Sequence, residues 1–238
     1  MRILSLSRRN LQKVALLSVA VVALNLLALR YLVLDDVDDV DLTLLSGHVV
    51  ALDPGHGGID SGARANGFRE KDITMAIAEK LTVILQENGA QVFLTRDSDV
   101  DYYTPGKGGK RNDLMKRVEI IEASGAQVYV SIHCNAIQAR RLSGAQVFYS
   151  PKLEENKMLA EGVQRALKKF PPGNKRQAKQ DLHILVLNAM NRPGILVEAG
   201  YLTNQTEAGL LADSGYQQKL AEQIAKGLAY HFSQNAGR

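Results

Sequence analysis

The chain of 238 residues has one cysteine, Cys134, so no disulfide bond can form within it. A single cysteine also gives no information on the redox compartment in which the protein works. Disulfides are not needed at this length, because one α/β domain of this size can bury a sufficient core. The sequence also has no internal repeat and no low-complexity segment, which excludes an array of repeated modules.

The chain has little excess of charge of one sign. Charged residues make up 23% of it, and the formal net charge is +4. No basic face with interleaved aromatic residues accompanies this excess, so we expect no nucleic-acid partner. A mildly basic chain instead suits an anionic partner, such as a cell-wall polymer or an acidic membrane surface. The glycine-containing loop 97–110 lacks the spacing and strand context of a phosphate loop, which leaves a lid, a substrate-facing rim or a solvated loop.

One long apolar run is present, and it lies at the N-terminus. Basic residues precede Val14–Leu29, and five aspartates follow between positions 35 and 41. No convincing small-x-small cleavage site follows Leu29, which favours an uncleaved anchor over a signal peptide. The order of the charges places the rest of the chain outside the cytoplasm. We therefore expect a signal-anchor at 1–35, an acidic linker at 36–47 and the folded domain at 48–238.

Strand-like and helix-like patterns alternate through this domain. The predicted strands are Val49–Leu52, Gln91–Leu94, Val128–Ile132, Ala145–Tyr149, Ile184–Leu187 and Gly194–Val197. The predicted helices are Ile73–Gln86, Asp113–Ser124, Leu153–Lys169 and Ser214–Gln234. This alternation predicts a single α/β domain, with a mostly parallel twisted sheet of about six strands and helices on both faces.

Residues with metal-binding or acid–base chemistry stand at the ends of these strands. His56, His133 and Glu198 lie at or just past strand ends, and Glu70 opens the helix after the first strand. An open α/β sheet places its ligand crevice at this edge, so the four should converge there. Two imidazoles and a carboxylate are a ligand set of catalytic zinc that leaves a position for water. We assign His56, Glu70 and His133 as zinc ligands and Glu198 as the general base.

Each residue alone also has a structural explanation. A histidine at a strand end more often caps or packs, and a carboxylate at Glu70 is favoured by the helix dipole. Glu198 is harder to explain in this way, because a buried strand rarely ends in an unpartnered carboxylate. Asp53 or Asp60 could orient a histidine or serve only in a turn. Substrate and structural contacts both remain open for three further residues: Arg96, Arg117 and His183.

Five motifs occur in an order that resembles one enzyme family. They are Leu52–Gly58, Glu70–Asp72, Leu94–Arg96, Ser131–Ala136 and Leu196–Asn204. This set is similar to that of the zinc-dependent N-acetylmuramoyl-L-alanine amidases, called amidase 3, and the resemblance extends from about Val49 to Phe232. It implies that 48–238 is a catalytic domain, with zinc held at His56, Glu70 and His133 and catalysis at Glu198. Cys134 is a departure from the family, but it should face away from His133 on an extended strand.

A narrower resemblance is to the germination-specific branch of that family. It rests on the N-terminal anchor, the loop before Lys110, the segment Ser143–Tyr149 and the segment from His183 to Gly194. It implies cleavage of the bond between N-acetylmuramic acid and L-alanine in spore-cortex peptidoglycan, as a step toward muramic-δ-lactam. A protein partner that assists metal binding is compatible with the sequence. The alternatives are another zinc hydrolase of wall polymers, such as a peptidase or deacetylase, and a catalytically silent regulatory module.

Overall fold

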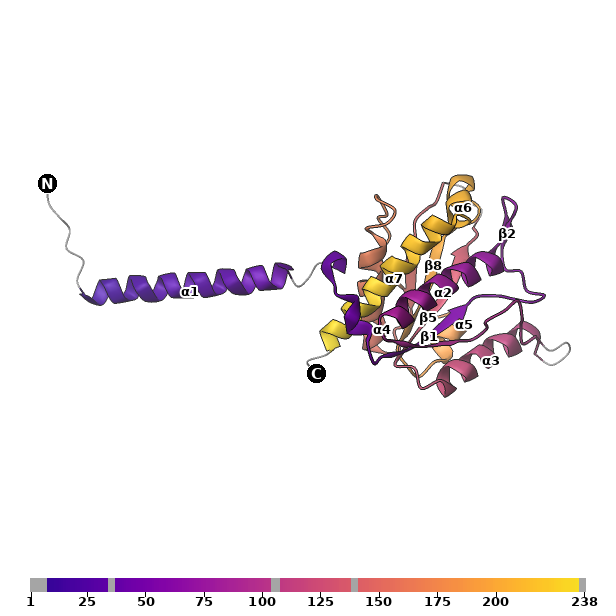
Figure 1. Ribbon diagram of the computed structural model, residues 1–238, viewed down its shortest axis with the longest axis horizontal. Coiled ribbons are helices and arrows are strands. Elements are labelled where there is room, and N and C mark those ends of the chain that lie inside the picture. The colour runs from indigo at the N-terminus through magenta and orange to yellow at the C-terminus, as the bar shows by residue number, and fades with distance from the viewer. Residues whose placement is uncertain (1–7, 34–36, 104–107, 138–140, 236–238) are drawn as a thin grey trace. The chain divides into compact units, whose positions relative to one another are not determined.

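The computed structural model describes residues 8–33, 37–103, 108–137 and 141–235 (Figure 1). They belong to two units, Met1–Asp39 and Val40–Arg238. The first contains helix α1 (Arg8–Val33) and the 3-10 helix η1 (Val37–Asp39). Within the described ranges, no helix has both the length and the apolar character needed to cross a membrane. The N-terminal anchor stays a prediction, and its junction with the linker, 34–36, lies outside the described residues.

The second unit is organised around a six-stranded sheet with the order β4-β1-β5-β8-β6-β7. The strands are β1 (Val49–Pro54), β4 (Gln91–Leu94), β5 (Val128–Asn135), β6 (Gln146–Tyr149), β7 (Lys179–Gln180) and β8 (Gly194–Tyr201). Neighbours among β4, β1, β5 and β8 run parallel, and β6 runs antiparallel to β8. A separate hairpin pairs β2 (Arg64–Ala65) with β3 (Phe68–Arg69). The predicted single α/β domain with a mostly parallel sheet is confirmed.

Helices cover both faces of the sheet (Figure 1). One face carries α2 (Glu70–Glu87), α4 (Glu154–Leu167), α6 (Gln205–Leu211) and α7 (Ser214–Asn235), and the other carries α3 (Gly109–Ala123) and α5 (Leu185–Ala189). Successive residues of a strand point to opposite faces, so β5 supplies Val130 to the core under the first set and Tyr129 to the core under the second. Because both faces of its central strands are buried, this parallel sheet consists of nearly continuous apolar runs.

The compact unit begins at Val40, whereas the sequence places the start of the domain near His48. The 3-10 helix η2 (Leu42–Leu45) is capped by Asp41, whose side chain accepts a hydrogen bond from the Thr43 N–H. Leu45 is fully buried in the larger core cluster. The C-terminal part of the expected acidic linker therefore contributes to the folded domain.

The strand that the sequence predicts at Ile184–Leu187 is wrong. This run enters the short helix α5, and Val186 and Leu187 are buried against the α3 side of the sheet. Asp181 accepts hydrogen bonds from the backbone N–H groups of His183 and Ile184, which turns the chain ahead of this helix. A short apolar run does not distinguish a strand from a buried helical turn. The sixth strand of the sheet is instead β7 at one edge, and its two polar residues show no strand pattern in the sequence.

Candidate metal centre and active site

His56, Glu70 and His133 form a cluster of three possible metal ligands. Their nearest ligand atoms all lie within 4.8 Å of one another. His56 follows β1, Glu70 is the first residue of α2, and His133 lies near the end of β5. Glu198 on β8 is the register partner of His133 on the neighbouring strand. All four residues line one cavity of about 360 Å³. The structure thus brings together the four residues that the sequence singles out.

The carboxylate of Glu70 is oriented by backbone groups from two other segments. Its Oε1 accepts the Cys134 N–H at 3.0 Å, and its Oε2 accepts the Ala63 N–H at 2.9 Å. The same oxygens lie 3.0 Å from His133 Nδ1 and 3.1 Å from His56 Nε2. Burial raises the pKa of Glu70, but the hydrogen bonds and charges of the two histidines outweigh it and hold the pKa well below its usual range. Glu70 is therefore a fixed, ionised oxygen donor between two imidazoles.

Asp60, and not Asp53, orients the ring of His56. Its Oδ2 lies 2.9 Å from His56 Nδ1, and its Oδ1 accepts the Gly62 N–H at 3.0 Å. The contact at Nδ1 leaves Nε2 directed at Glu70, which is the arrangement that a ligand histidine requires. His56 has a φ of 61°, a left-handed conformation that is rare outside glycine, and the Arg117 guanidinium donates to its carbonyl oxygen. The turn around His56 is thus held by residues distant in sequence.

Glu198 differs from Glu70 because its Oε2 is shielded from solvent and has no hydrogen-bond partner in the described part of the chain. Burial is the main cause that raises the pKa of Glu198 to about 7, with Glu70 raising it further and His133 and His56 lowering it. A shielded carboxylate oxygen without a protein partner is costly, and it can accept a hydrogen bond from a bound water or ligand. A pKa near neutrality is also what general base catalysis requires.

The close packing of the site explains the glycine at position 55 and the position of the cysteine. A Cβ atom on Gly55 would lie 2.3 Å from His133 Cε1, so no larger residue fits there without displacing that ring. Cys134 is 3% exposed and belongs to the larger core cluster. Burial raises the pKa of its thiol well above the usual value. Its side chain is not one of the three clustered ligands, although its backbone N–H holds Glu70.

Two of the residues with open roles are buried beneath the site and hold its backbone. Arg96 donates to the carbonyl oxygens of Pro54, Gly55 and Lys71. Arg117 donates to the carboxylates of Asp53 and Asp113 at 2.9 and 3.0 Å. These contacts give both arginines a structural role, whereas His183 is exposed. None of the three belongs to the ligand cluster.

We expect Arg117→Met to lower the free energy of unfolding by about 3–5 kcal/mol, because it leaves two buried carboxylates without their cation. Arg117 and Asp53 are each 1% exposed at the side chain, so solvent cannot replace the contact. Urea unfolding of the full chain, followed by circular dichroism, measures the change. Lys116→Met is the matched control on the same helix, since Lys116 is 43% exposed and should tolerate the change. A loss below 1 kcal/mol in Arg117→Met would show that the pair does not support the fold.

The site lies on the fold of a known class of amide hydrolases. The family model described as N-acetylmuramoyl-L-alanine amidase matches residues 50–230, and the chain belongs to this family. Among its relatives is the germination-specific N-acetylmuramoyl-L-alanine amidase of Bacillus subtilis (strain 168). The two are 42% identical over 194 residues, which cover 80% of this chain and 82% of that one. The family resemblance noted in the sequence and the enzyme class are thereby confirmed.

Two solved structures show the same likeness. The first is the CwlD amidase from Clostridioides difficile, described in complex with the GerS lipoprotein. It is 36% identical with a TM-score of 0.75, and the match covers 79% of this chain and 100% of that one. The second is the amidase AmiC2 of Nostoc punctiforme, 34% identical with a TM-score of 0.67, where the match covers 81% and 99%.

Proposed function

We propose that this amidase is zinc-dependent and cleaves the amide bond between N-acetylmuramic acid and L-alanine in peptidoglycan. The observation that carries the proposal is the convergence of His56, Glu70 and His133 beside an unpartnered oxygen of Glu198. Two imidazoles and one carboxylate, each offering one atom to a common point, fit the donor chemistry of catalytic zinc. When bound, zinc would polarise the scissile carbonyl and lower the pKa of a water molecule to about 7.

The protein's own residues perform the proton transfers in this proposal. Glu198 takes the proton of the attacking water, since its Oε2 has no hydrogen-bond partner in the described part of the chain. It then delivers that proton to the nitrogen of L-alanine as the amide bond breaks. Asp60 keeps the His56 ring in one orientation, and the Ala63 and Cys134 N–H groups keep the Glu70 carboxylate in place. These contacts fix the orientations of the two ligand side chains.

Metal analysis of the purified full chain together with a peptidoglycan digest tests this proposal. We expect one zinc per chain and release of peptides that begin with L-alanine, with the N-acetyl groups of the sugars intact. Mass spectrometry of the products separates the rival hydrolases. A deacetylase would remove acetyl groups from the sugar, and a peptidase would leave alanine on the lactyl group. A zinc-loaded chain that releases no product would be a catalytically silent module.

The spore cortex is the proposed location of the substrate, and muramic-δ-lactam formation is the proposed use of the product. The 42% identity to a germination-specific amidase supports this narrower assignment. A protein partner that assists metal binding is part of the same proposal. It is supported by the likeness to an amidase that is described in complex with a lipoprotein.

We also propose that residues 1–35 anchor the chain in a membrane, with the catalytic domain outside the cytoplasm. The support is the order of basic residues, apolar run and aspartates in the sequence. We expect the full-length chain, with its N-terminus intact by mass spectrometry, in the membrane fraction of cells. A chain that starts after residue 35 is the control and should leave that fraction. Recovery of only a soluble extracellular form, shortened near residue 30, would show a cleaved signal instead.

A further inference from the structure

Lys110 is an accessible cation at the cavity of the metal centre. Among the described residues that line this cavity, Lys110 is the one lysine and Arg117 the one arginine. The side chain of Arg117 is 1% exposed and is fully used by Asp53, Asp113 and two backbone carbonyls. The side chain of Lys110 is 62% exposed. A negatively charged group that enters the cavity can therefore be met by Lys110 but not by Arg117.

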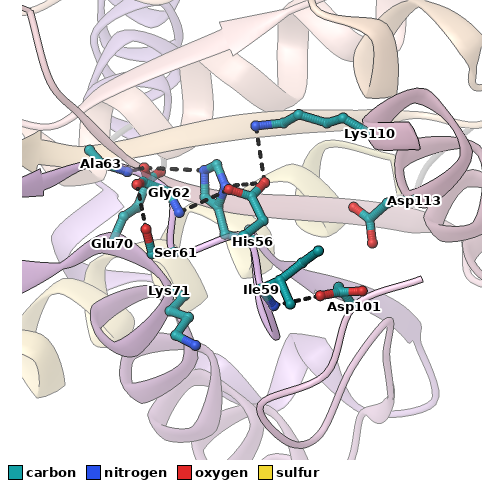
Figure 2. Close-up of polar contacts among 12 residues, drawn as sticks. His56, Ile59, Ser61, Gly62, Ala63, Glu70, Lys71, Asp101, Lys110 and Asp113 are labelled. Atoms are coloured by element: carbon teal, nitrogen blue, oxygen red, sulfur yellow. Dashed lines mark hydrogen bonds and ion pairs between the residues drawn. The ribbon is translucent and has the colours of Figure 1, made fainter. Parts of the chain in front are cut away.

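Lys110 is connected to the metal centre through a single carboxylate. Its Nζ lies 3.0 Å from Asp60 Oδ2, the oxygen that is also 2.9 Å from His56 Nδ1. Figure 2 shows Lys110 extending from its helix toward the loop that carries His56. An ion pair with so exposed a lysine contributes little to stability, so the ammonium can turn to another anion at little cost. Asp60 would keep its contacts to His56 and Gly62 without it.

The stability of helix α3 does not explain a lysine at this position. Lys110 lies in the first turn of α3, which contains no acidic residue. The helix dipole favours negative side chains in a first turn and disfavours positive ones. The surroundings also favour a cation at this position, since Asp60, Glu70 and Glu198 all line the cavity. Lys110 at the rim is placed to meet an anionic group of a substrate that approaches these carboxylates.

We propose that Lys110 binds a carboxylate on the peptide residue that follows L-alanine, which makes it a determinant of substrate specificity. This inference rests on the proposed cleavage of the muramoyl–alanine bond, because that bond fixes which part of the substrate lies near the metal centre. The distances are compatible with it. Two residues of extended peptide span about 7 Å, and only the Asp60 and His56 side chains separate Lys110 from the ligand cluster.

Two matched substrates test the proposal. One is a muramoyl tripeptide whose second residue carries a free carboxylate, and the other has that carboxylate converted to a carboxamide. With the zinc-loaded full chain, we expect Lys110→Met to raise KM for the carboxylate substrate about 3-fold, as for the loss of an exposed ion pair. KM for the carboxamide, kcat for both substrates and the zinc content should stay unchanged.

Lys116→Met on the same helix is the control and should alter neither KM, since Lys116 pairs with exposed Glu119. If Lys110→Met changed KM equally for both substrates, or for neither, the proposal would be overturned. Calorimetry measures the dissociation constants of both substrates without turnover when the chain carries Glu198→Gln. We compare this chain with one that also carries Lys110→Met. If the wild-type chain cleaved neither substrate, the proposed function would fail. The calorimetry would still decide the role of Lys110, because a larger effect of Lys110→Met on the dissociation constant of the carboxylate substrate than on that of the carboxamide does not depend on turnover.

Discussion

Glu198→Gln is expected to slow hydrolysis by roughly 10²- to 10⁴-fold, the range for the loss of a general base. The glutamine side chain has the same shape, but its amide cannot take the proton of the attacking water. Burial keeps the Glu198 pKa at about 7, so the wild-type residue can both accept and return a proton near neutral pH. Single-turnover kinetics with a muramoyl peptide, at saturating substrate, measures the chemical step directly.

The zinc content of Glu198→Gln should equal that of the wild type, because Glu198 is outside the ligand cluster. Its unfolding midpoint should not fall, because the change removes a buried carboxylate whose Oε2 has no partner in the described residues. Glu119→Gln, a change on the exposed surface of α3, is the control for the loss of one negative charge and should be fully active. If Glu198→Gln turned over at a near-normal rate with zinc bound, Glu198 would have no part in the proton transfer.

The second large effect concerns the ligands. His56→Ala, Glu70→Ala and His133→Ala should each abolish stoichiometric zinc binding, since three protein ligands leave no redundancy. Elemental analysis of the dialysed proteins gives the metal content, and circular dichroism shows whether the fold survives. Glu70→Ala also leaves the N–H groups of Ala63 and Cys134 without their acceptor. We therefore include Glu70→Gln, which keeps an acceptor oxygen but not the charge.

Cys134→Ala separates the ligand set from its neighbour. Zinc binds thiolates well, so a cysteine beside a ligand histidine is a natural rival for the assignment. Its thiol belongs to the core and has a raised pKa, so zinc content should be nearly unchanged in Cys134→Ala. Full zinc in Glu70→Ala, or its loss in Cys134→Ala, would mean that the ligand set is different.

The sequence predicts most of the fold because the central strands have strong signals. The runs at Val50–Leu52 in β1 and Val128–Ile132 in β5 are buried on both sides, so tertiary context and local preference agree. The prediction is wrong at Ile184–Leu187, where the same apolar residues pack in a short helix. It also misses α6 and the β2–β3 hairpin, whose short segments carry too few apolar positions to show a period.

The four residues of the candidate site could be picked out from the sequence because parallel strands end at one edge of the sheet. The residues around them could not be resolved in this way. Asp53 and Asp60 look equivalent in the sequence, yet one pairs with Arg117 and the other with His56. The contact between Lys110 and Asp60 joins segments that are distant in the chain. Only the packing of α3 beside the segment that follows β1 brings that pair together.

The buried position of Cys134 has a practical consequence for measurements on this protein. The thiolate is the form that reacts with maleimides, and a thiol that is 3% exposed with a raised pKa is inert to them. Because the chain has no other cysteine, the wild type provides an unreactive background. A single cysteine introduced by Lys116→Cys would be the one labelling position in the folded protein. A fluorophore attached there would lie on the same helix as Lys110 and could report binding of a peptide at the cavity rim.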